Sequence, residues 1–241
     1  MHLRRYYKDI TWIFGKLCCQ KPRQQGKKRK LTFSGAKGIF TLFYDSGGFA
    51  AEKRPDLKRH VRLTDDEAFS LYGTQIRKDF DENEIKPEWV IRTLQESGEY
   101  FCDVMCDGSG ALLSYAFVLR HKDLFFLDYF ATVENKRGCG FGTGMLSYLF
   151  GTYDGAWLLE VEDPERARDA REREAMMKRI RFYEHAGAAR TVVQVTAFGH
   201  PYCLMVKGQD ARDASAVTQQ YLDVYRSIVG TNLSRVIRVI D

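Results

Sequence analysis

Four glycines stand at alternate positions just after a long apolar stretch. They are Gly138, Gly140, Gly142 and Gly144. The apolar stretch, residues 124–133, has the pattern of a strand, and apolar residues at helical spacing begin at Met145. Glycines let the backbone approach a ligand closely. The first N–H groups of a helix and the positive end of its dipole both attract anions. The segment therefore predicts an anion-binding loop, because a ligand-free turn, the alternative, does not need glycine at every second position.

The spacing of these glycines excludes the two commonest nucleotide motifs. A Walker loop requires G-x-x-x-x-G-K followed by Ser or Thr, and no Lys-Ser or Lys-Thr pair is present. A dinucleotide fingerprint requires G-x-G-x-x-G, but the third glycine would fall on Thr143 in one register and on Met145 in the other. The pattern that fits is R-x-x-G-x-G, formed by Arg137, Gly140 and Gly142.

This pattern resembles the pyrophosphate loop that follows the fourth strand in the GNAT acyltransferase superfamily. The resemblance covers roughly residues 57–208: residues 156–162 look like the fifth strand, and residues 179–187 are similar to the family's R-x-x-FYE-x-x-GF segment. Residues 80–87 are similar to an FPxxERKP stretch of one bacterial branch. Glu134 stands where proline is common and Ala188 where phenylalanine is preferred, but neither departure removes a phosphate contact.

The resemblance implies acetyl-CoA as cosubstrate and no metal. The residues that it implies in acetyl-CoA binding are Ala131, Thr132, Val133, Arg137, Gly138, Cys139, Gly140, Phe141, Gly142 and Thr143. The loop N–H groups would bind the pyrophosphate, with Arg137 adding charge or shaping the loop. The backbone of Ala131, Thr132 and Val133 would pair with the pantetheine arm. In such folds the fourth and fifth strands splay apart and leave backbone groups that need hydrogen-bond partners.

Direct acetyl transfer to an amine needs a base, donors for the oxyanion and an acid for the departing thiolate. By resemblance the acid is Tyr183, which matches the family's tyrosine on the helix after the fifth strand. A phenol has a pKa in a usable range for a thiolate leaving group. The alternative is a helical aromatic residue that only packs beside Phe182.

Two carboxylates on the predicted fifth strand are candidates for the base. Glu160 and Glu162 are alternate residues, so they should point to the same face of the strand. If that face lines the splayed groove, one of them, with Glu162 favoured because it is nearer the strand end, would act directly or through water. The alternative is an exposed pair, or one bound to the arginines of residues 165–173. His185 and His200 are weaker base candidates.

Capping and turn signals place these residues on a series of short elements. Thr64 and Glu67 form a capping box before a helix that we expect to end near Phe80, and Pro87 begins a second helix that stops near Gly98. Three consecutive antiparallel strands follow at residues 100–105, 111–119 and 124–133. The third is apolar on both faces, which predicts a central strand, and alternation places Phe125, Leu127, Tyr129 and Ala131 on one side.

The remaining elements complete an α/β (α+β) fold. Strands at residues 192–196 and 202–206 follow the helix of Tyr183, and a closing helix spans residues 214–228. The mainly charged residues between Pro164 and Arg179 have the mixed signs of a solvated helix. We therefore expect a GNAT-type mixed, mostly antiparallel twisted sheet flanked by helices.

Charge divides the sequence into two parts. Residues 1–56 hold 13 of the 37 Lys and Arg residues and 4 of the 32 Asp and Glu residues, a balance of +9 against −4 for residues 57–241. We expect a basic, flexible N-terminal extension over residues 1–56 and the acyltransferase domain over residues 57–241. The basic cluster at residues 27–30 has no aromatic residues interleaved to stack bases, so a nucleic-acid partner is disfavoured.

The composition indicates in which cellular compartment we expect the protein. Apolar runs fall short of the roughly 18 residues that cross a bilayer, and no small-residue cleavage site precedes the basic cluster. Six cysteines without zinc-site spacing indicate reduced thiols, which favours a cytoplasmic location and excludes a disulfide scaffold.

The function predicted from all of these features is direct transfer of an acetyl group from acetyl-CoA to a primary amine. A small-molecule amine is the expected acceptor, and a homodimer is one state that the sequence allows. A noncatalytic module that binds CoA or a regulatory ligand, with the basic tail serving interaction, is the competing hypothesis. The sequence does not encode which amine is the acceptor.

Overall fold

The computed structural model describes residues 29–35, 38–44 and 58–240. The division into a basic extension and a domain at residue 57 is left untested, because most of residues 1–57 lies outside the described residues. Two strands within the predicted extension, β1 (Arg29–Gly35) and β2 (Gly38–Tyr44), pair antiparallel as a two-stranded sheet of their own. We expected a flexible extension over these residues, and the sequence patterns did not predict this pairing.

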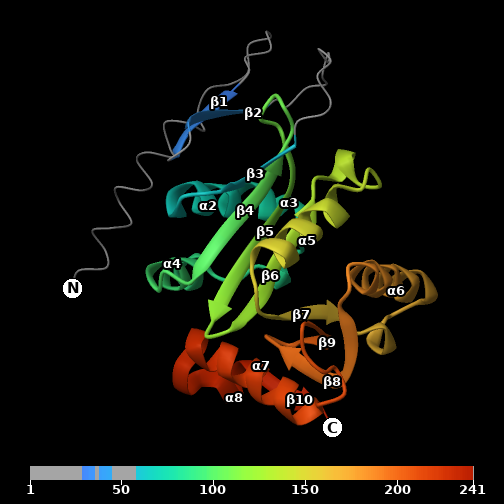
Figure 1. Cartoon of the computed structure of the whole chain (residues 1–241). Coiled ribbons are helices and arrows are strands. Elements are labelled where there is room, and N and C mark those ends of the chain that lie inside the picture. The colour runs from blue at the N-terminus through green and yellow to red at the C-terminus, as the bar shows by residue number, and fades with distance from the viewer. Residues whose placement is uncertain (1–28, 36–37, 45–57, 241) are drawn as a thin grey trace.

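One eight-stranded sheet forms the centre of the molecule (Figure 1). Its strands, in spatial order, are β10 (Ile237–Ile240), β8 (Ala189–Ala197), β9 (His200–Lys207), β7 (Ala156–Glu162), β6 (Leu124–Thr132), β5 (Leu112–His121), β4 (Tyr100–Cys106) and β3 (Arg59–Arg62). Every neighbouring pair is antiparallel except β6 and β7. The mixed, mostly antiparallel sheet and the central position of β6 confirm the predicted fold class.

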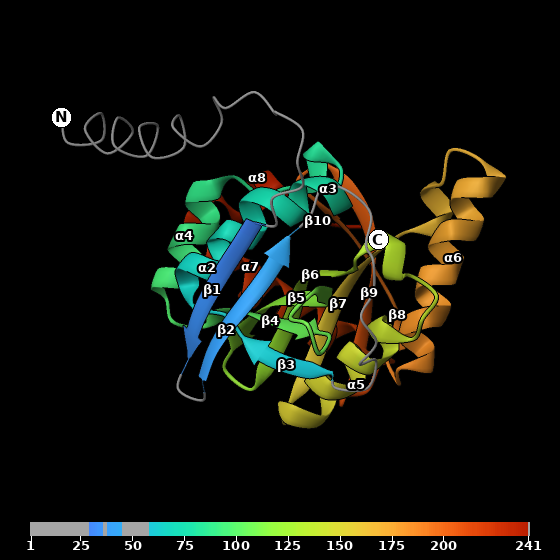
Figure 2. The ribbon, with the colours of Figure 1, turned by 90° about the horizontal axis from the view of Figure 1, so that it is seen from above.

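Helices cover both faces of the sheet, and the two faces have separate apolar cores. The helices are α2 (Asp65–Leu71), α3 (Arg77–Asp79), α4 (Glu88–Glu96), α5 (Phe141–Thr152), α6 (Ala170–His185), α7 (Ala214–Val229) and α8 (Leu233–Val236). Residues of α2, α4 and α7 pack in one core, and residues of α5 and α6 pack in the other. Figure 2 shows α5 and α6 on the opposite side of the sheet from α2, α4 and α7. Within the described residues, no helix is long and apolar enough to cross a membrane.

Local signals fix where the first helices begin. The hydroxyl of Thr64 accepts from the backbone N–H of Glu67, whose carboxylate accepts from the N–H of Thr64, so the predicted capping box is confirmed. The single helix expected up to Phe80 is divided into α2, the π-helical turn η1 (Tyr72–Ile76) and α3. Pro87 is the N-cap of α4, as its fixed φ favours.

Short 3₁₀ turns join several of the longer elements. They are η2 (Glu82–Glu84), η3 (Glu134–Lys136), η4 (Pro164–Arg166) and η5 (Gly230–Asn232). The charged segment around η4 and the start of α6 pairs with itself through Arg168 with Glu172 and Arg173 with Glu165, so its predicted solvated character is confirmed.

Candidate active site

The parallel pair at the centre of the sheet separates half-way along its length. Over the described residues, β6 pairs with β7 only from Leu124 opposite Ala156 to Leu127 opposite Leu159. Beyond this point β6 continues along β5 and β7 continues along β9. The facing edges therefore leave backbone groups without a strand partner, which confirms the splay that the GNAT resemblance implied.

A bulge in β6 marks where the separation begins. Phe117 of β5 faces Tyr129, whereas the next residue, Val118, faces Leu127, so Asp128 is an extra residue on β6. Leu127 packs in the core of α5 and α6, but Tyr129 packs in the core of α7. The predicted placement of Leu127 and Tyr129 on one side is thus wrong, because the extra residue reverses the alternation.

Backbone groups alternate in direction along the open half of β6. The N–H of Val133 donates to the C=O of Leu113 of β5 at 3.0 Å, so Val133, and Ala131 two residues earlier, direct their backbone groups toward β5. Thr132 lies between them and directs its backbone groups into the opening, where its C=O accepts from Nε of Arg137 at 3.2 Å. Of the three residues predicted to face pantetheine, Thr132 is the one that the strand geometry favours.

The glycine loop lies at the wide end of this opening and leads into α5. Gly138 and Gly140 have φ of 78° and 79°, a left-handed conformation that glycine adopts without steric cost. Gly140 is the N-cap of α5 and has no side chain with which to cap it. The first helical hydrogen bond runs from the N–H of Gly144 to the C=O of Gly140, so the N–H groups of residues 141–143 have no acceptor within the helix. These groups are suited to an anion, as predicted.

The other two glycines serve packing. A Cβ atom on Gly142 would lie 3.0 Å from Oγ1 of Thr132 and 3.2 Å from Cζ of Phe182, and one on Gly144 would lie 3.3 Å from Cε of Met105. The lack of a side chain lets α5 approach β6 and α6 closely at Gly142 and β4 closely at Gly144. The four alternate glycines therefore have two different roles. Gly138 and Gly140 allow a left-handed backbone conformation, and the other two allow close packing.

Arg137 is held at two points along its side chain. Besides the bond of its Nε to Thr132, its guanidinium lies 3.8 Å from Oδ1 of Asp79, at the end of α3. Asp79 is buried and accepts from the amide of Gln75 and the hydroxyl of Tyr115. The Arg137 side chain is 57% exposed, so it is oriented by the protein while one side remains open to an anion.

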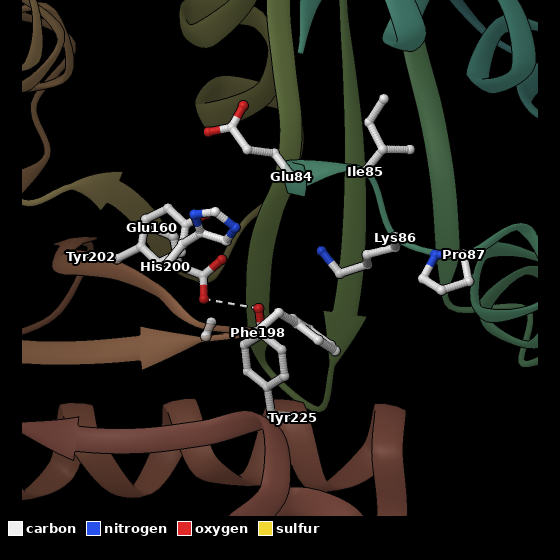
Figure 3. A pocket seen from close by; sticks show the side chains of 10 residues that line it. Glu84, Ile85, Lys86, Pro87, Glu160, Phe198, His200, Tyr202 and Tyr225 are labelled. Carbon is white, nitrogen blue, oxygen red and sulfur yellow. Dashed lines mark hydrogen bonds between the residues drawn. The ribbon is translucent and has the colours of Figure 1, made fainter. Parts of the chain in front are cut away.

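A pocket of about 90 Å³ lies on the α7 side of the sheet. Its walls come from the segment of η2 to Pro87, from Glu160 of β7, from the turn between β8 and β9, and from Tyr225 of α7 (Figure 3). These segments are far apart in the sequence and meet where β6 and β7 separate.

Glu160 is the carboxylate at the inner end of this pocket. Its Oε1 accepts from the hydroxyls of Tyr221 at 2.6 Å and Tyr225 at 2.8 Å, so Oε2 takes neither of these bonds. Burial raises the pKa of Glu160, although Lys86 and the two hydroxyls oppose this shift. A carboxylate with a raised pKa is better matched to accept a proton near neutral pH than an exposed one.

A buried ion pair lies next to Glu160. Nζ of Lys86 is 2.5 Å from Oδ1 of Asp128, the bulge residue, whose Oδ2 accepts from the hydroxyl of Tyr100 at 2.6 Å. Burial alone would lower the pKa of Lys86, but Asp128, Tyr129 and Glu160 together raise it, so the side chain keeps its positive charge. The hydroxyl of Tyr129 also accepts from the backbone N–H of Lys86 at 2.8 Å, which fixes the pocket wall to β6.

No family model and no curated protein matches the sequence. Among solved structures, the chain is similar to a protein of Bacteroides thetaiotaomicron described as a GNAT-family acetyltransferase, with 20% identity and a TM-score of 0.59 over 71% of this chain and 97% of that one. It is also similar to the ribosomal-protein-S18-alanine N-acetyltransferase of Escherichia coli, with 17% identity and a TM-score of 0.46 over 63% and 93% of the two chains. The chain has the GNAT fold. In this chain the glycine loop joins β6 to α5, at the end of the strand that separates from β7.

Tyr183, the acid candidate of the GNAT resemblance, lies on the α6 side of the opening. Its ring packs 6.2 Å from that of Phe130, in the open half of β6, and 5.3 Å from that of Phe182. Burial raises the pKa of Tyr183 to about 12. The hydroxyl therefore stays protonated. It can donate a hydrogen bond to a thiolate but does not readily give up its proton, because a thiol has a pKa of only ~8.5.

Glu160 and Glu162 bind partners from helices that cover opposite faces of the GNAT sheet. Glu160 is bound by α7, whereas Glu162 forms an ion pair with Arg179 of α6. The expectation that both carboxylates line one groove is not met, because Glu162 ends the strand within reach of a long α6 side chain. Among the two, the structure brings only Glu160 into the pocket.

His185 and His200, the weaker base candidates, lie in different parts of the structure. His200 lines the pocket, whereas Nδ1 of His185 is bonded to the backbone carbonyl oxygen of Arg181 within α6 at the exposed surface.

Several polar residues of this site in the GNAT fold were missed from the sequence. They are Asp79, Lys86, Asp128, Tyr221 and Tyr225. Tyr221 and Tyr225 lie in the predicted closing helix, and their spacing of four residues, which brings both hydroxyls to one acceptor, was the available signal. Asp128 interrupts an otherwise apolar strand, and a charge at such a position was the signal for a buried polar cluster.

Proposed function

We propose that the protein is an acetyl-CoA-dependent N-acetyltransferase that transfers the acetyl group directly to a primary amine. The observation that carries this proposal is the opening between β6 and β7, which has an uncapped glycine loop at one end and the carboxylate of Glu160 in the pocket behind it. An activated acyl group and an amine could meet there from opposite faces of the sheet.

The coenzyme side is formed by one stretch of sequence. The N–H groups of residues 138–143 would bind the pyrophosphate, with Arg137 held near them by Thr132 and Asp79. The pantetheine arm would lie along the open edge of β6 and pair with the backbone of Thr132. These roles make residues 131–143 the acetyl-CoA segment.

The acceptor side supplies the base. An amine bound in the pocket is protonated at neutral pH, and Glu160 would take its proton through Oε2, directly or through one water. The amine nitrogen then attacks the thioester carbon, and a C–N bond forms. The unpaired backbone N–H groups of β6 that face the opening would stabilise the oxyanion.

Collapse of the tetrahedral intermediate breaks the C–S bond. The nitrogen still carries one proton more than the amide needs, and it loses this proton to solvent. The hydroxyl of Tyr183 would donate a hydrogen bond to the departing thiolate, which gains its proton from solvent after release. This is a narrower role than the general acid expected from the sequence, because burial raises the pKa of Tyr183 to about 12. Glu162, paired with Arg179, would position α6 beside the opening.

The experiment that tests this function measures CoA release from acetyl-CoA with a panel of primary amines and identifies the acetylated product by mass spectrometry. We expect release that depends on both substrates and a product acetylated on nitrogen. Acetyl-CoA binding without amine-dependent release would favour the competing hypothesis of a noncatalytic CoA-binding module. We expect a small-molecule acceptor and a cytoplasmic location.

A further inference from the structure

The charged side chains of the pocket do not balance. Glu84 and Glu160 both line it, and Lys86 is the one Lys or Arg among the lining residues that the structure describes. The charge of Lys86 is already matched by Asp128 at 2.5 Å, outside the pocket lining. With Glu160 ionised, as a base must be, the walls present an excess of negative charge, which favours a cation over an anion.

The two carboxylates are placed for two different groups of one ligand. Glu160 is fixed at the inner end by Tyr221 and Tyr225. Glu84 is half-buried in η2, where its Oε2 accepts from the N–H of Asp81 at 3.3 Å, and Figure 3 shows its carboxylate directed away from Glu160. Tyr202 lines the same pocket, and burial together with the charges of Glu160 and Glu84 raises the pKa of its hydroxyl.

The walls between the carboxylates suit a narrow alkyl group. Phe198, Tyr202 and Tyr225 supply rings, and aromatic faces accommodate both methylene groups and ammonium ions. The volume of the pocket, about 90 Å³, suits a short, unbranched chain beside the reacting amine.

We propose that the acceptor is an unbranched alkyl diamine, with the reacting amine at Glu160 and the second ammonium at Glu84. This inference rests on the proposed N-acetyltransferase function and adds its substrate class. An amino acid of the same length would bring a carboxylate against Glu84 and is rejected. A monoamine of the same length fills the inner part of the pocket but leaves Glu84 without a partner.

The test compares butane-1,4-diamine, butylamine and 4-aminobutanoate as acceptors for the full-length protein with acetyl-CoA. We expect kcat/KM to fall by about tenfold from the diamine to the monoamine, which lacks the attraction to Glu84, and by about tenfold again to the amino acid, which is repelled by Glu84. Glu84→Gln keeps the hydrogen bond to Asp81 and should lower the diamine-to-monoamine ratio by about tenfold. Glu82→Gln, an exposed residue of the same turn outside the pocket, should leave the ratio unchanged.

Each outcome decides the proposal. Equal kcat/KM for the diamine and the amino acid, or a ratio that is unchanged in Glu84→Gln, would overturn the diamine assignment while leaving amine acetylation intact. Acetyl-CoA binding with no CoA release for any of the three compounds would overturn the proposed function together with it. Calorimetric binding of the diamine to the CoA complex of each variant, with thermal unfolding as the check of folding, separates lost recognition from a lost fold.

Discussion

The two faces of the β6–β7 opening are built in different ways. On the α5 and α6 face, the loop, its glycines and Arg137 belong to one stretch that ends β6 and begins α5. On the α7 face, the pocket joins η2, β7, the turn of β8 and β9, and α7. In the proposed function, the first face would bind an anion through backbone N–H groups at a helix start, and the second would bind a cation through a buried carboxylate held by tyrosines. A sheet that opens at its centre would thus let an anion site and a cation site share one reacting position.

The difference predicts that binding and chemistry can be separated by mutation. Changes in the pocket on the α7 face should affect turnover and acceptor choice, and changes in the glycine loop and Arg137 should affect coenzyme affinity. Tyr183, which borders the opening from α6, should affect turnover. A single substitution that altered both equally would break the comparison.

The largest effect is expected for Glu160→Gln. Removing the base should lower kcat by about a thousandfold, because Gln keeps the hydrogen bonds from Tyr221 and Tyr225 but cannot take a proton. The wild-type kcat/KM should rise with pH through the raised pKa of Glu160, since only the ionised form accepts a proton, and this acidic limb should disappear in the variant. Steady-state kinetics across pH measures both, and an unchanged calorimetric Kd for acetyl-CoA is the control.

Tyr183→Phe should have the next largest effect. Loss of the hydroxyl should lower kcat by about tenfold to a hundredfold with little change in the KM for acetyl-CoA, because the ring contacts with Phe130 and Phe182 remain. Tyr148→Phe in α5, whose ring stacks on His60 away from the opening, is the matched control. If kcat stayed at the wild-type level from neutral to alkaline pH, the role given to Tyr183 would be wrong.

Gly142→Ala tests the close approach of α5 to β6. The added Cβ would crowd Oγ1 of Thr132 and Cζ of Phe182, so the loop should shift and the KM for acetyl-CoA should rise by about tenfold, a cost of ~1.4 kcal/mol. Gly151→Ala lies in the same helix with open space around its Cβ position, and it should leave KM unchanged and stabilise the fold by about 0.5–1 kcal/mol. Kinetics and thermal unfolding of the two variants decide between these results.

The smallest effect is expected for Asp79→Asn. The variant keeps acceptors for Gln75 and Tyr115 but loses the charge that orients Arg137, which retains its bond to Thr132. The Kd for acetyl-CoA should rise by about threefold to tenfold, with kcat at saturation nearly unchanged. Asp66→Asn, an exposed carboxylate of α2, removes the same charge and should have no effect on Kd. A larger loss of kcat than of affinity would contradict a role through Arg137.

The α5 and α6 face, where we propose that the coenzyme binds, could be predicted from the sequence because its signals are local. Arg137, Gly140 and Gly142 lie within six residues, and the strand before them and the helix after them have clear patterns. Even so, the sequence did not reveal that Gly142 serves packing, since Phe182 meets it only in the folded protein. The capping box and the order of the longer helices followed from local rules in the same way, whereas strand ends such as the start of β8 at Ala189 were displaced by up to three residues.

The α7 face, where we propose that the acceptor amine binds, could not be predicted to the same extent because its contacts are long-range. Glu160 was one of two carboxylates that alternation treats alike, and only the position of α7 in space distinguishes it from Glu162. Lys86 and Asp128 are 42 residues apart, and no spacing rule connects them. The bulge at Asp128 also broke the alternation assumed for β6.

A crystal structure of the protein with CoA tests the central claim most directly, because it shows whether the opening between β6 and β7 is the reacting position. We expect the pyrophosphate on the N–H groups of residues 138–143, the pantetheine paired with the backbone of Thr132, and the sulfur near Tyr183 with the Glu160 pocket behind it. A coenzyme bound elsewhere, or a sulfur that faces away from that pocket, would contradict the account.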